Sequence, residues 1–231
     1  MIHPTTTPPM TMRDLTDFFM IDSPMRVRPT RRLLALSLSL AFVACDGATD
    51  SLAPEERPAS LLHLLTVKSD APGLANPNVS FYAVKGRNAG ADIWYRPRAG
   101  QRDSTKFLEF RLGGATLDRR PDGTAIADGD SVRITVTVTD PAHLIVQFQP
   151  SGLTFSSKDL ARLRMFFGEA GDDLDGNGRV DSDDDSVEQK LSLWRQEASG
   201  LPWFKLFSAV VKDSKRVDAD LNGFTGYALA Y

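Results

Sequence analysis

A strict alternation of apolar and polar residues runs from Ser131 to Thr139 and constrains the fold more than any other part of the chain. One side of this segment carries only β-branched apolar residues, which are Val132, Ile134, Val136 and Val138. Neighbouring residues of a strand point to opposite faces, so the pattern predicts a strand with one buried face and one face in water. Strands of this kind are typical of antiparallel sheets that pack on a core.

Similar short segments follow one another through the rest of the chain, and Gly, Pro, Asn and Asp turn signals separate most of them. The further predicted strands are Val79–Val84, Ala91–Tyr95, Phe107–Leu112, Leu144–Phe148, Ala161–Phe167, Lys190–Arg195, Trp203–Phe207, Arg216–Leu221 and Tyr227–Tyr231. No internal repeat and no long helical pattern interrupts them. The sequence therefore predicts an all-β fold, an antiparallel β-sandwich over residues 61–231.

The segment 172–185 is the most acidic part of the chain, with seven aspartates and one arginine in 14 residues. Carboxylates packed into a compact loop repel one another unless a cation lies between them. Ca²⁺ suits such a loop because it accepts six to eight flexible oxygen ligands, and the absence of His and Cys from the segment argues against zinc. The alternative is a solvated acidic loop without an ion.

The spacing within residues 173–184 resembles the calcium loop of EF-hands and dockerins, with Gly178 at the sharp turn. Asp184 stands where an EF-hand has glutamate, whereas dockerin loops commonly carry aspartate there. Arg179 would contribute its backbone carbonyl. The ligands implied by the resemblance are Asp173, Asp175, Asn177, Arg179, Asp181 and Asp184.

The flanks of this loop favour strands over the two helices of an EF-hand. Upstream, the alternation in Ala161–Phe167 is typical of a strand, and polar residues occupy both ends of the loop. We therefore expect a calcium-binding insertion that joins two strands of the sandwich. A helical interpretation also remains open, with Leu160, Leu163, Phe166 and Phe167 upstream and Val187, Leu191 and Trp194 downstream.

The first 45 residues have the pattern of a targeting segment. Four arginines between Arg26 and Arg32 precede the uncharged apolar run Leu33–Ala44, whose 12 residues are too few to span a bilayer. This arrangement predicts an export signal. The residues before Met25 add nothing to it, and they are either an over-extended reading frame or a genuine N-terminal extension.

Cys45 is the only cysteine and lies where the predicted signal ends. The segment Phe42–Cys45 resembles the lipobox of bacterial lipoproteins, with Phe42 where an aliphatic residue is usual. The resemblance implies that Cys45 becomes the diacylated N-terminus of a protein anchored in the cell envelope, facing the periplasm or the exterior. The alternative is a soluble exported protein with a free thiol.

The polar, proline-containing residues 46–60 are predicted to be a flexible linker between lipid and domain. The whole chain has 27 Lys and Arg against 30 Asp and Glu, a net charge of −3. A domain that grips nucleic acid through phosphates is normally strongly basic, so no nucleic-acid partner is expected.

The C-terminal segment weakly resembles the end of the ZU-five-type β-sandwich of ankyrins and netrin receptors. The likeness is carried by a tryptophan strand at Trp203 and a closing strand with Phe224, Thr225 and Tyr227, while Gly223 stands where the family has histidine. It implies a binding or structural module rather than an enzyme. Independently of it, Trp203, Phe224 and Tyr227 are predicted to be core aromatics.

No catalytic motif accompanies His3, His63 or His143, so we expect no enzyme activity. The favoured hypothesis is a lipid-anchored β-sandwich that binds one structural Ca²⁺ and acts as a cell-envelope module for a protein or polysaccharide ligand. The alternatives are a calcium-dependent docking or switch protein of the EF-hand or dockerin type and, less favoured, an envelope hydrolase whose carboxylate pair is hidden in the sandwich.

Overall fold

The computed structural model describes residues 54–231, which lie within one compact unit. The predicted export signal, Cys45 and the first part of the linker lie outside the described residues. Within residues 54–231 there is one α-helix, α1 (Ser182–Lys190), and no helix with the length and hydrophobicity required to span a membrane.

All the strand pairings are antiparallel, which confirms the predicted all-β sandwich. The larger sheet has the spatial order β1 (Glu56–Arg57), β11 (Trp203–Lys205), β10 (Ser192–Gln196), β14 (Gly226–Ala230), β7 (Ile145–Gln149), β6 (Ser131–Asp140) and β2 (Asn78–Val84). The second sheet has the order β12 (Ser208–Val211), β13 (Arg216–Leu221), β9 (Ala161–Phe166), β4 (Lys106–Leu112) and β3 (Ala89–Trp94). A small third sheet pairs β5 (Leu117–Arg119) with β8 (Thr154–Phe155).

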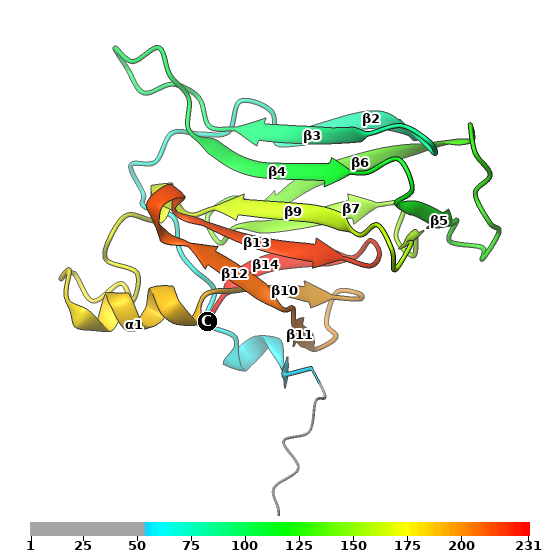
Figure 1. Ribbon diagram of the computed structural model, residues 1–231. Helices are drawn as coiled ribbons and strands as arrows, with labels where there is room; N and C mark the ends of the chain where they lie inside the picture. The colour runs from blue at the N-terminus through cyan, green and yellow to red at the C-terminus, as the bar shows by residue number, and fades with distance from the viewer. Residues whose placement is uncertain (1–53) are drawn as a thin grey trace, which may run out of the picture. The chain divides into compact units, whose positions relative to one another are not determined.

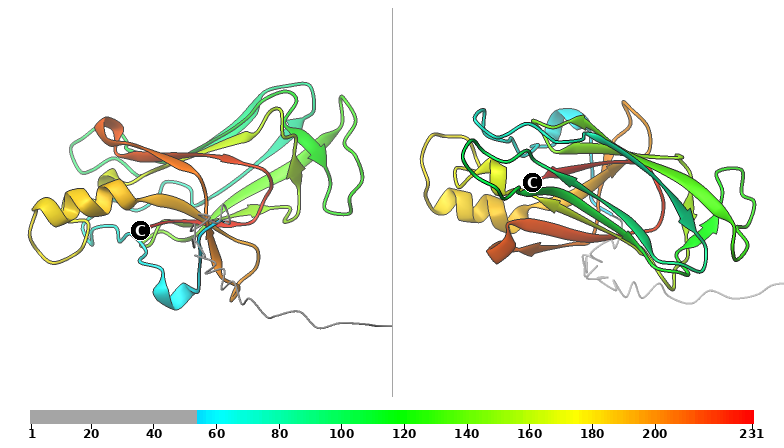
Figure 2. Two further views of the ribbon diagram at one scale, coloured as in Figure 1. Left: turned by 60° about the horizontal axis from the view of Figure 1, so that its bottom comes forward. Right: turned by 90° about the horizontal axis from the view of Figure 1, so that it is seen from above.

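The five-stranded sheet lies in front of the seven-stranded sheet in Figure 1. α1 and the acidic loop lie at one end of the sandwich, and the turns around β5 lie at the opposite end, which the two views of Figure 2 also show. The length of the strands therefore separates the acidic loop from the turns around β5.

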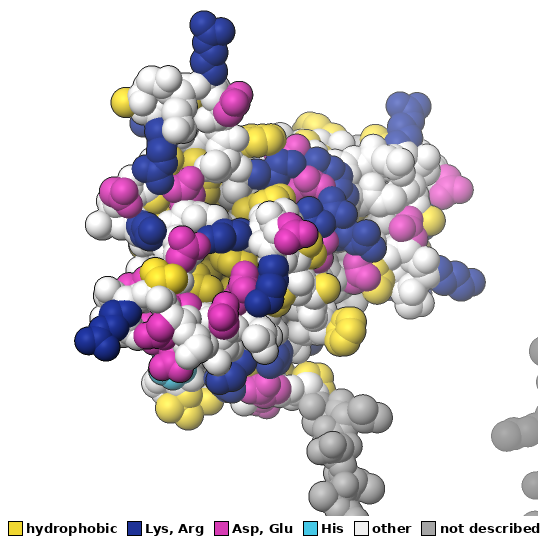
Figure 3. Space-filling model, turned by 60° about the vertical axis from the view of Figure 1, so that its left-hand side comes forward, with side chains coloured by type: hydrophobic (Ala, Val, Ile, Leu, Met, Phe, Trp, Pro, Cys, Tyr) yellow, Lys and Arg dark blue, Asp and Glu magenta, His cyan; other side chains and the backbone are white. Residues whose placement is uncertain are grey.

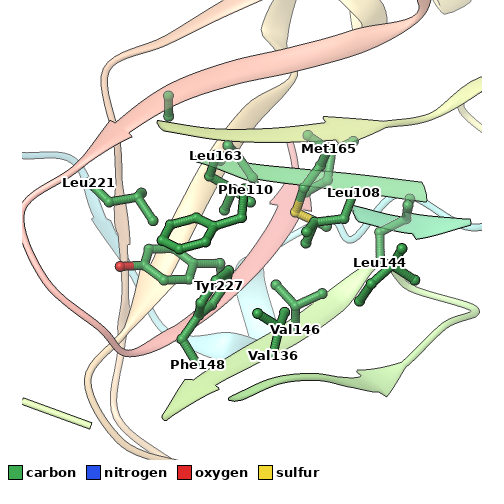
Figure 4. Packing of buried hydrophobic residues seen from close by; sticks show 14 of the residues in the cluster. Leu108, Phe110, Val136, Leu144, Val146, Phe148, Leu163, Met165, Leu221 and Tyr227 are labelled. Carbon is green, nitrogen blue, oxygen red and sulfur yellow. The ribbon is translucent and has the colours of Figure 1, made fainter. Parts of the chain in front are cut away.

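The core fills the space between the two sheets because each strand turns its apolar residues inward. Val132, Ile134, Val136 and Val138 of β6 are all buried, as the alternation predicts. Phe110 from the five-stranded sheet points toward Phe148 and Tyr227 from the seven-stranded sheet, and Met165 points toward Val146 (Figure 4). The predicted core aromatics Trp203, Phe224 and Tyr227 are buried.

β14 is buried on both of its faces, unlike the half-buried outer strands. Leu229 faces the main core, whereas Ala228 and Ala230 pack with Trp194 in a second apolar cluster on the other side of the larger sheet. Residues 61–65 cover that side, and the Leu65 N–H donates to the Leu229 carbonyl at 3.1 Å.

The described end of the predicted flexible linker is ordered. Glu56 and Arg57 form β1 and pair with Phe204 and Trp203 of β11, and Ala59–Leu61 form a 3-10 turn. The linker prediction is therefore wrong for these residues. Two contacts hold this polar segment in place. Its backbone pairs with β11, and the Arg57 guanidinium lies 5.2 Å from the centroid of the Trp194 ring. Neither contact could be expected from the composition of the segment.

The outer face of the five-stranded sheet carries a lattice of ion pairs. Glu109 of β4 accepts hydrogen bonds from Lys106 Nζ at 2.6 Å and from Arg164 Nη1 of β9 at 2.5 Å. Arg164 also donates to Asp218 of β13 at 3.3 Å. Basic and acidic side chains are correspondingly interleaved on the surface in Figure 3. The alternating charges connect neighbouring strands on the side of the sheet that has no core to pack against.

Replacement of Glu109 by glutamine is expected to lower the free energy of unfolding at neutral pH by about 1.5–3 kcal/mol, the range for hydrogen bonds to a charged partner. Burial opposes ionisation of Glu109, but the Lys106 and Arg164 donors outweigh it and hold the pKa below the ordinary value of 4.5. Because the folded pKa is lowered, this stabilisation is present above pH 4.5 and is lost as pH falls through the folded pKa.

The measurement is urea unfolding of the protein and of Glu109→Gln between neutral and acid pH. The stability difference should shrink as the solution becomes acidic. Asp220→Asn is the control, since Asp220 pairs with Arg162 on an exposed part of the same face. This substitution should lower the free energy of unfolding by less than about 1 kcal/mol. An unchanged difference at all pH values would contradict the role of the Glu109 carboxylate.

Candidate metal centre

The acidic loop connects the two sheets, since it lies between β9 of the smaller sheet and β10 of the larger one. The predicted upstream strand is confirmed as β9. The expected strand downstream of the loop is β10, but it begins only at Ser192, and the preferred interpretation did not include α1, which occupies Ser182–Lys190. The helical alternative is wrong upstream of the loop. Downstream it holds only in part, because Val187 lies in α1, whereas Leu191 is the C-cap and Trp194 lies in β10.

α1 forms because the end of the loop supplies a complete N-terminal cap. The Asp181 carboxylate accepts from the Asp183 N–H at 2.9 Å, and the Asp184 carboxylate accepts from the Asp181 N–H at 2.8 Å. The Asp181 side chain also bonds the backbone of Asp184, so Asp181 and Asp184 form a capping box, and acidic residues in the first turn interact favourably with the helix dipole. Lys190 lies in the last turn, where a positive charge is favourable.

Three of the six predicted ligand residues converge. Asp173, Asp175 and Asp184 each offer one carboxylate oxygen, and these oxygens lie within 4.8 Å of one another. The chain brings them together because the loop folds back on itself at Gly176 and Gly178, where φ is 74° and 83°. Such positive φ values favour glycine, so the turn requires the residue type that the loop has there.

Asp184 is the most buried carboxylate of the loop, with 4% of the residue exposed. One of its oxygens, Oδ1, accepts from the Leu174 N–H at 2.6 Å and from the Asp175 N–H at 3.2 Å, while Oδ2 accepts from the Asp181 N–H. The Asp181 donor and the other two N–H groups hold the pKa of Asp184 below its ordinary value. This side chain therefore stays ionised and connects the beginning of the loop to α1.

Asp173 has one satisfied and one unsatisfied oxygen. Its Oδ2 accepts from the Gly178 N–H at 2.9 Å. Its Oδ1 is shielded from solvent and has no hydrogen-bond partner among the described residues. A buried anionic oxygen without a donor costs free energy, and a cation beside it removes that cost. The residues present thus fit a bound cation.

The other predicted ligands lie in the loop but outside this trio of carboxylates. Asn177 Nδ2 donates to Asp175 Oδ2 at 2.8 Å, and Asn177 Oδ1 accepts from the Arg179 N–H at 2.8 Å. Asp181 caps α1 with its carboxylate. The corresponding loop position in calcium sites often acts through a water molecule, so capping and metal binding are compatible for Asp181.

Two lysines that the sequence analysis did not identify flank the entrance of the loop. Lys215 Nζ donates to the Gly171 carbonyl at 3.1 Å and to the Asp172 carboxylate, and this hydrogen bond lowers the pKa of Asp172. The Lys68 side chain packs so closely on Gly171 that a Cβ there would lie 1.9 Å from Lys68 Cε. Neither lysine is near the loop in sequence, so no local pattern could have pointed to them.

The two histidines of the described residues have partners of their own. His63 stacks on Tyr231 with ring centroids 5.5 Å apart, and His143 Nδ1 lies 2.8 Å from Asp140 Oδ2. Neither belongs to the group of converging ligand atoms, which are all carboxylate oxygens of Asp173, Asp175 and Asp184.

A comparison of the chain with protein-family models, curated proteins and solved structures gives no match. The lipobox, calcium-loop and ZU-five resemblances therefore stay predictions, and what can be concluded about this protein rests on its own residues and geometry.

Proposed function

We propose that the protein is an exported, lipid-anchored β-sandwich that binds one structural Ca²⁺ and serves as a binding or scaffold module of the cell envelope. The observation that carries the metal proposal is the shielded, unpartnered Oδ1 of Asp173 beside the carboxylates of Asp175 and Asp184. Three negative charges held this close favour a divalent cation.

The chemistry of the loop favours Ca²⁺ over other divalent cations. Asp173, Asp175 and Asp184 would hold the ion directly, Asn177 and the Arg179 carbonyl would add oxygens, and Asp181 would act through water. Mg²⁺ demands a stricter octahedral arrangement and keeps more of its water. Zinc prefers nitrogen and sulfur ligands, which this loop lacks.

The ion would act as a cross-link rather than as a switch. The loop connects β9 to β10, so a cation within it stabilises the connection between the two sheets. α1 is also held independently of the ion, because Val187 is buried in the core and Glu188 pairs with Lys212 at 2.7 Å. A switch would have to break these contacts.

The alternative is a calcium-dependent switch or docking element, and the observation that favours it is that α1 follows the loop directly, as the second helix of an EF-hand does. Circular dichroism distinguishes the two functions. A structural ion raises the melting temperature with little change in spectrum, whereas a switch changes the helical signal when Ca²⁺ is added.

The support for the lipid anchor is the sequence from Arg26 to Cys45, with its basic, apolar and lipobox-like parts in order. Two acyl chains hold a soluble body at a membrane, whereas one binds only marginally. The intact mass of the protein expressed with its signal in a lipoprotein-processing bacterium tests this step. A diacylated N-terminus at Cys45 supports the anchor, and a Cys45→Ser variant provides the unmodified reference.

Calorimetric titration with Ca²⁺ tests the metal centre. The protein should release or absorb heat with a stoichiometry near one, and the Asp173→Ala, Asp184→Ala double variant should not. For a Kd near 0.1 mM, about 1 mM Ca²⁺ would stabilise the fold by about 1.4 kcal/mol. Absence of binding heat and of any thermal shift in the unmodified protein would remove the ion from the proposal.

A further inference from the structure

An apolar surface patch lies where the described chain begins. Phe207, in the connection between β11 and β12, is 99% exposed. It lines a hollow of about 310 Å³ together with the apolar residues Pro54, Leu160, Phe204 and Leu206 and the polar residues Arg195, Lys205, Asp220 and Asn222. We call Phe207 and the four other apolar residues the entry patch. A fully exposed phenylalanine beside other apolar side chains is unfavourable in water and marks a contact surface.

The length of the preceding chain limits what this patch can face. Only residues 46–53 separate Cys45 from Pro54. Nine residue-to-residue steps reach at most about 32 Å when fully extended. A lipid attached to Cys45 therefore holds Pro54, and with it the entry patch, close to the bilayer surface.

We infer that the entry patch is a membrane-contact surface, with Phe207 inserted into the interfacial region of the bilayer that holds the lipid on Cys45. The inference rests on the proposed lipid anchor and adds an orientation to it. The edge of the sandwich that carries β1 and Phe207 lies against the membrane, and the opposite edge, which carries β2, points away from it.

The charges around the patch indicate an apolar contact rather than an ionic one. Lys205 pairs with Glu55 at 3.1 Å, and Arg195 pairs with Glu197 at 3.1 Å. Because these basic groups already have acidic partners, the contact should depend on burial of Phe207 and Leu160 and should persist at high salt.

A single-thiol experiment on the full lipidated chain tests this inference. Cys45 is the only cysteine and its thiol is consumed by lipidation, so Phe207→Cys provides one reactive thiol for an environment-sensitive fluorophore. Tyr82→Cys is the matched control, because Tyr82 is a 68% exposed aromatic residue on β2, at the other edge of the larger sheet. Each labelled protein is reconstituted into vesicles of phosphatidylethanolamine and phosphatidylglycerol with and without nitroxide-labelled lipid.

The nitroxide lipid should quench the probe at position 207 several-fold more strongly than the probe at position 82, and iodide in the water should quench it several-fold less. Equal quenching at both positions in a protein whose mass shows the lipid overturns the membrane contact but leaves the anchor intact. Protection of position 207 from iodide without quenching by the lipid also overturns it and points to a protein partner or a second copy. An unmodified Cys45 overturns the anchor and the inference together.

Discussion

Replacement of Phe148 by alanine is expected to lower the free energy of unfolding by about 3–5 kcal/mol, the cost of removing a large aromatic side chain from a packed core. Phe148 is fully buried, and its ring centroid lies 4.9 Å from that of Phe110 and 5.0 Å from that of Phe224. The ring also meets Tyr227 edge to face, so the substitution leaves a cavity among aromatic groups from both sheets. Urea unfolding monitored by tryptophan fluorescence measures the loss.

Phe207→Ala is the matched control for this substitution, because it removes the same side chain from a position that is 99% exposed. The free energy of unfolding of this variant should change by less than about 0.5 kcal/mol in the absence of membranes. A cost below about 1 kcal/mol for Phe148→Ala would contradict the packing described between the two sheets.

Replacement of Asp184 by alanine is expected to abolish the thermal shift with Ca²⁺ and also to lower the melting temperature in EDTA. The second effect has a separate cause, because the Asp184 carboxylate accepts from the Leu174, Asp175 and Asp181 N–H groups whether or not an ion is bound. Those donors, of which the Leu174 N–H is buried, lose their acceptor, and α1 loses half of its capping box. Thermal unfolding in EDTA and in 1 mM Ca²⁺ separates the two effects.

Asp175→Ala provides the contrast, since Asp175 is exposed and its carboxylate accepts only from Asn177 among the described residues. This variant should show no rise in melting temperature with Ca²⁺. In EDTA its melting temperature should be close to that of the parent protein. In the parent protein, chelation should lower the melting temperature by about 3–6 °C relative to 1 mM Ca²⁺, if the ion contributes about 1.4 kcal/mol. Equal behaviour of the two variants in EDTA would contradict the scaffold role of Asp184.

The long strands were predictable from sequence because one apolar face imposes a period of two. β6 and β13 lie where the alternation places them, and the predicted bounds of most other strands differ from the observed ones by a few residues. The strands that the sequence did not predict are β1, β5, β8 and β12, of two to four residues each. β5 and β8 contain three and two residues, so no alternation can develop within them.

α1 was expected only under the helical alternative, and for a different reason. Val187 is the only apolar residue among its nine, so the helix has no apolar stripe to recognise. The signal that could have identified it is the spacing of Asp181 and Asp184, since an acceptor at the cap and a second one three residues later are typical of a helix start. The same two aspartates also match the calcium-loop spacing, so the metal-ligand prediction and the helix start coincide in sequence.

The candidate site was predictable as far as its residues are neighbours in sequence. Twelve consecutive residues contain all six predicted ligands, and the structure brings Asp173, Asp175 and Asp184 together. The surroundings of the site depend on long-range contacts. Lys215 reaches Asp172 from the β12–β13 connection, and only the pairing of β13 with β9 brings it there.

The central position of β14 sets the order in which the protein can assemble. Its residues 226–230 pair with β7 on one side and β10 on the other, so the larger sheet stays in two parts until this late segment has been synthesised. Pairings between distant segments slow folding and leave apolar surface open for longer. Apolar surface on the earlier strands therefore stays uncovered until residues 226–230 are available to join the two parts of the sheet.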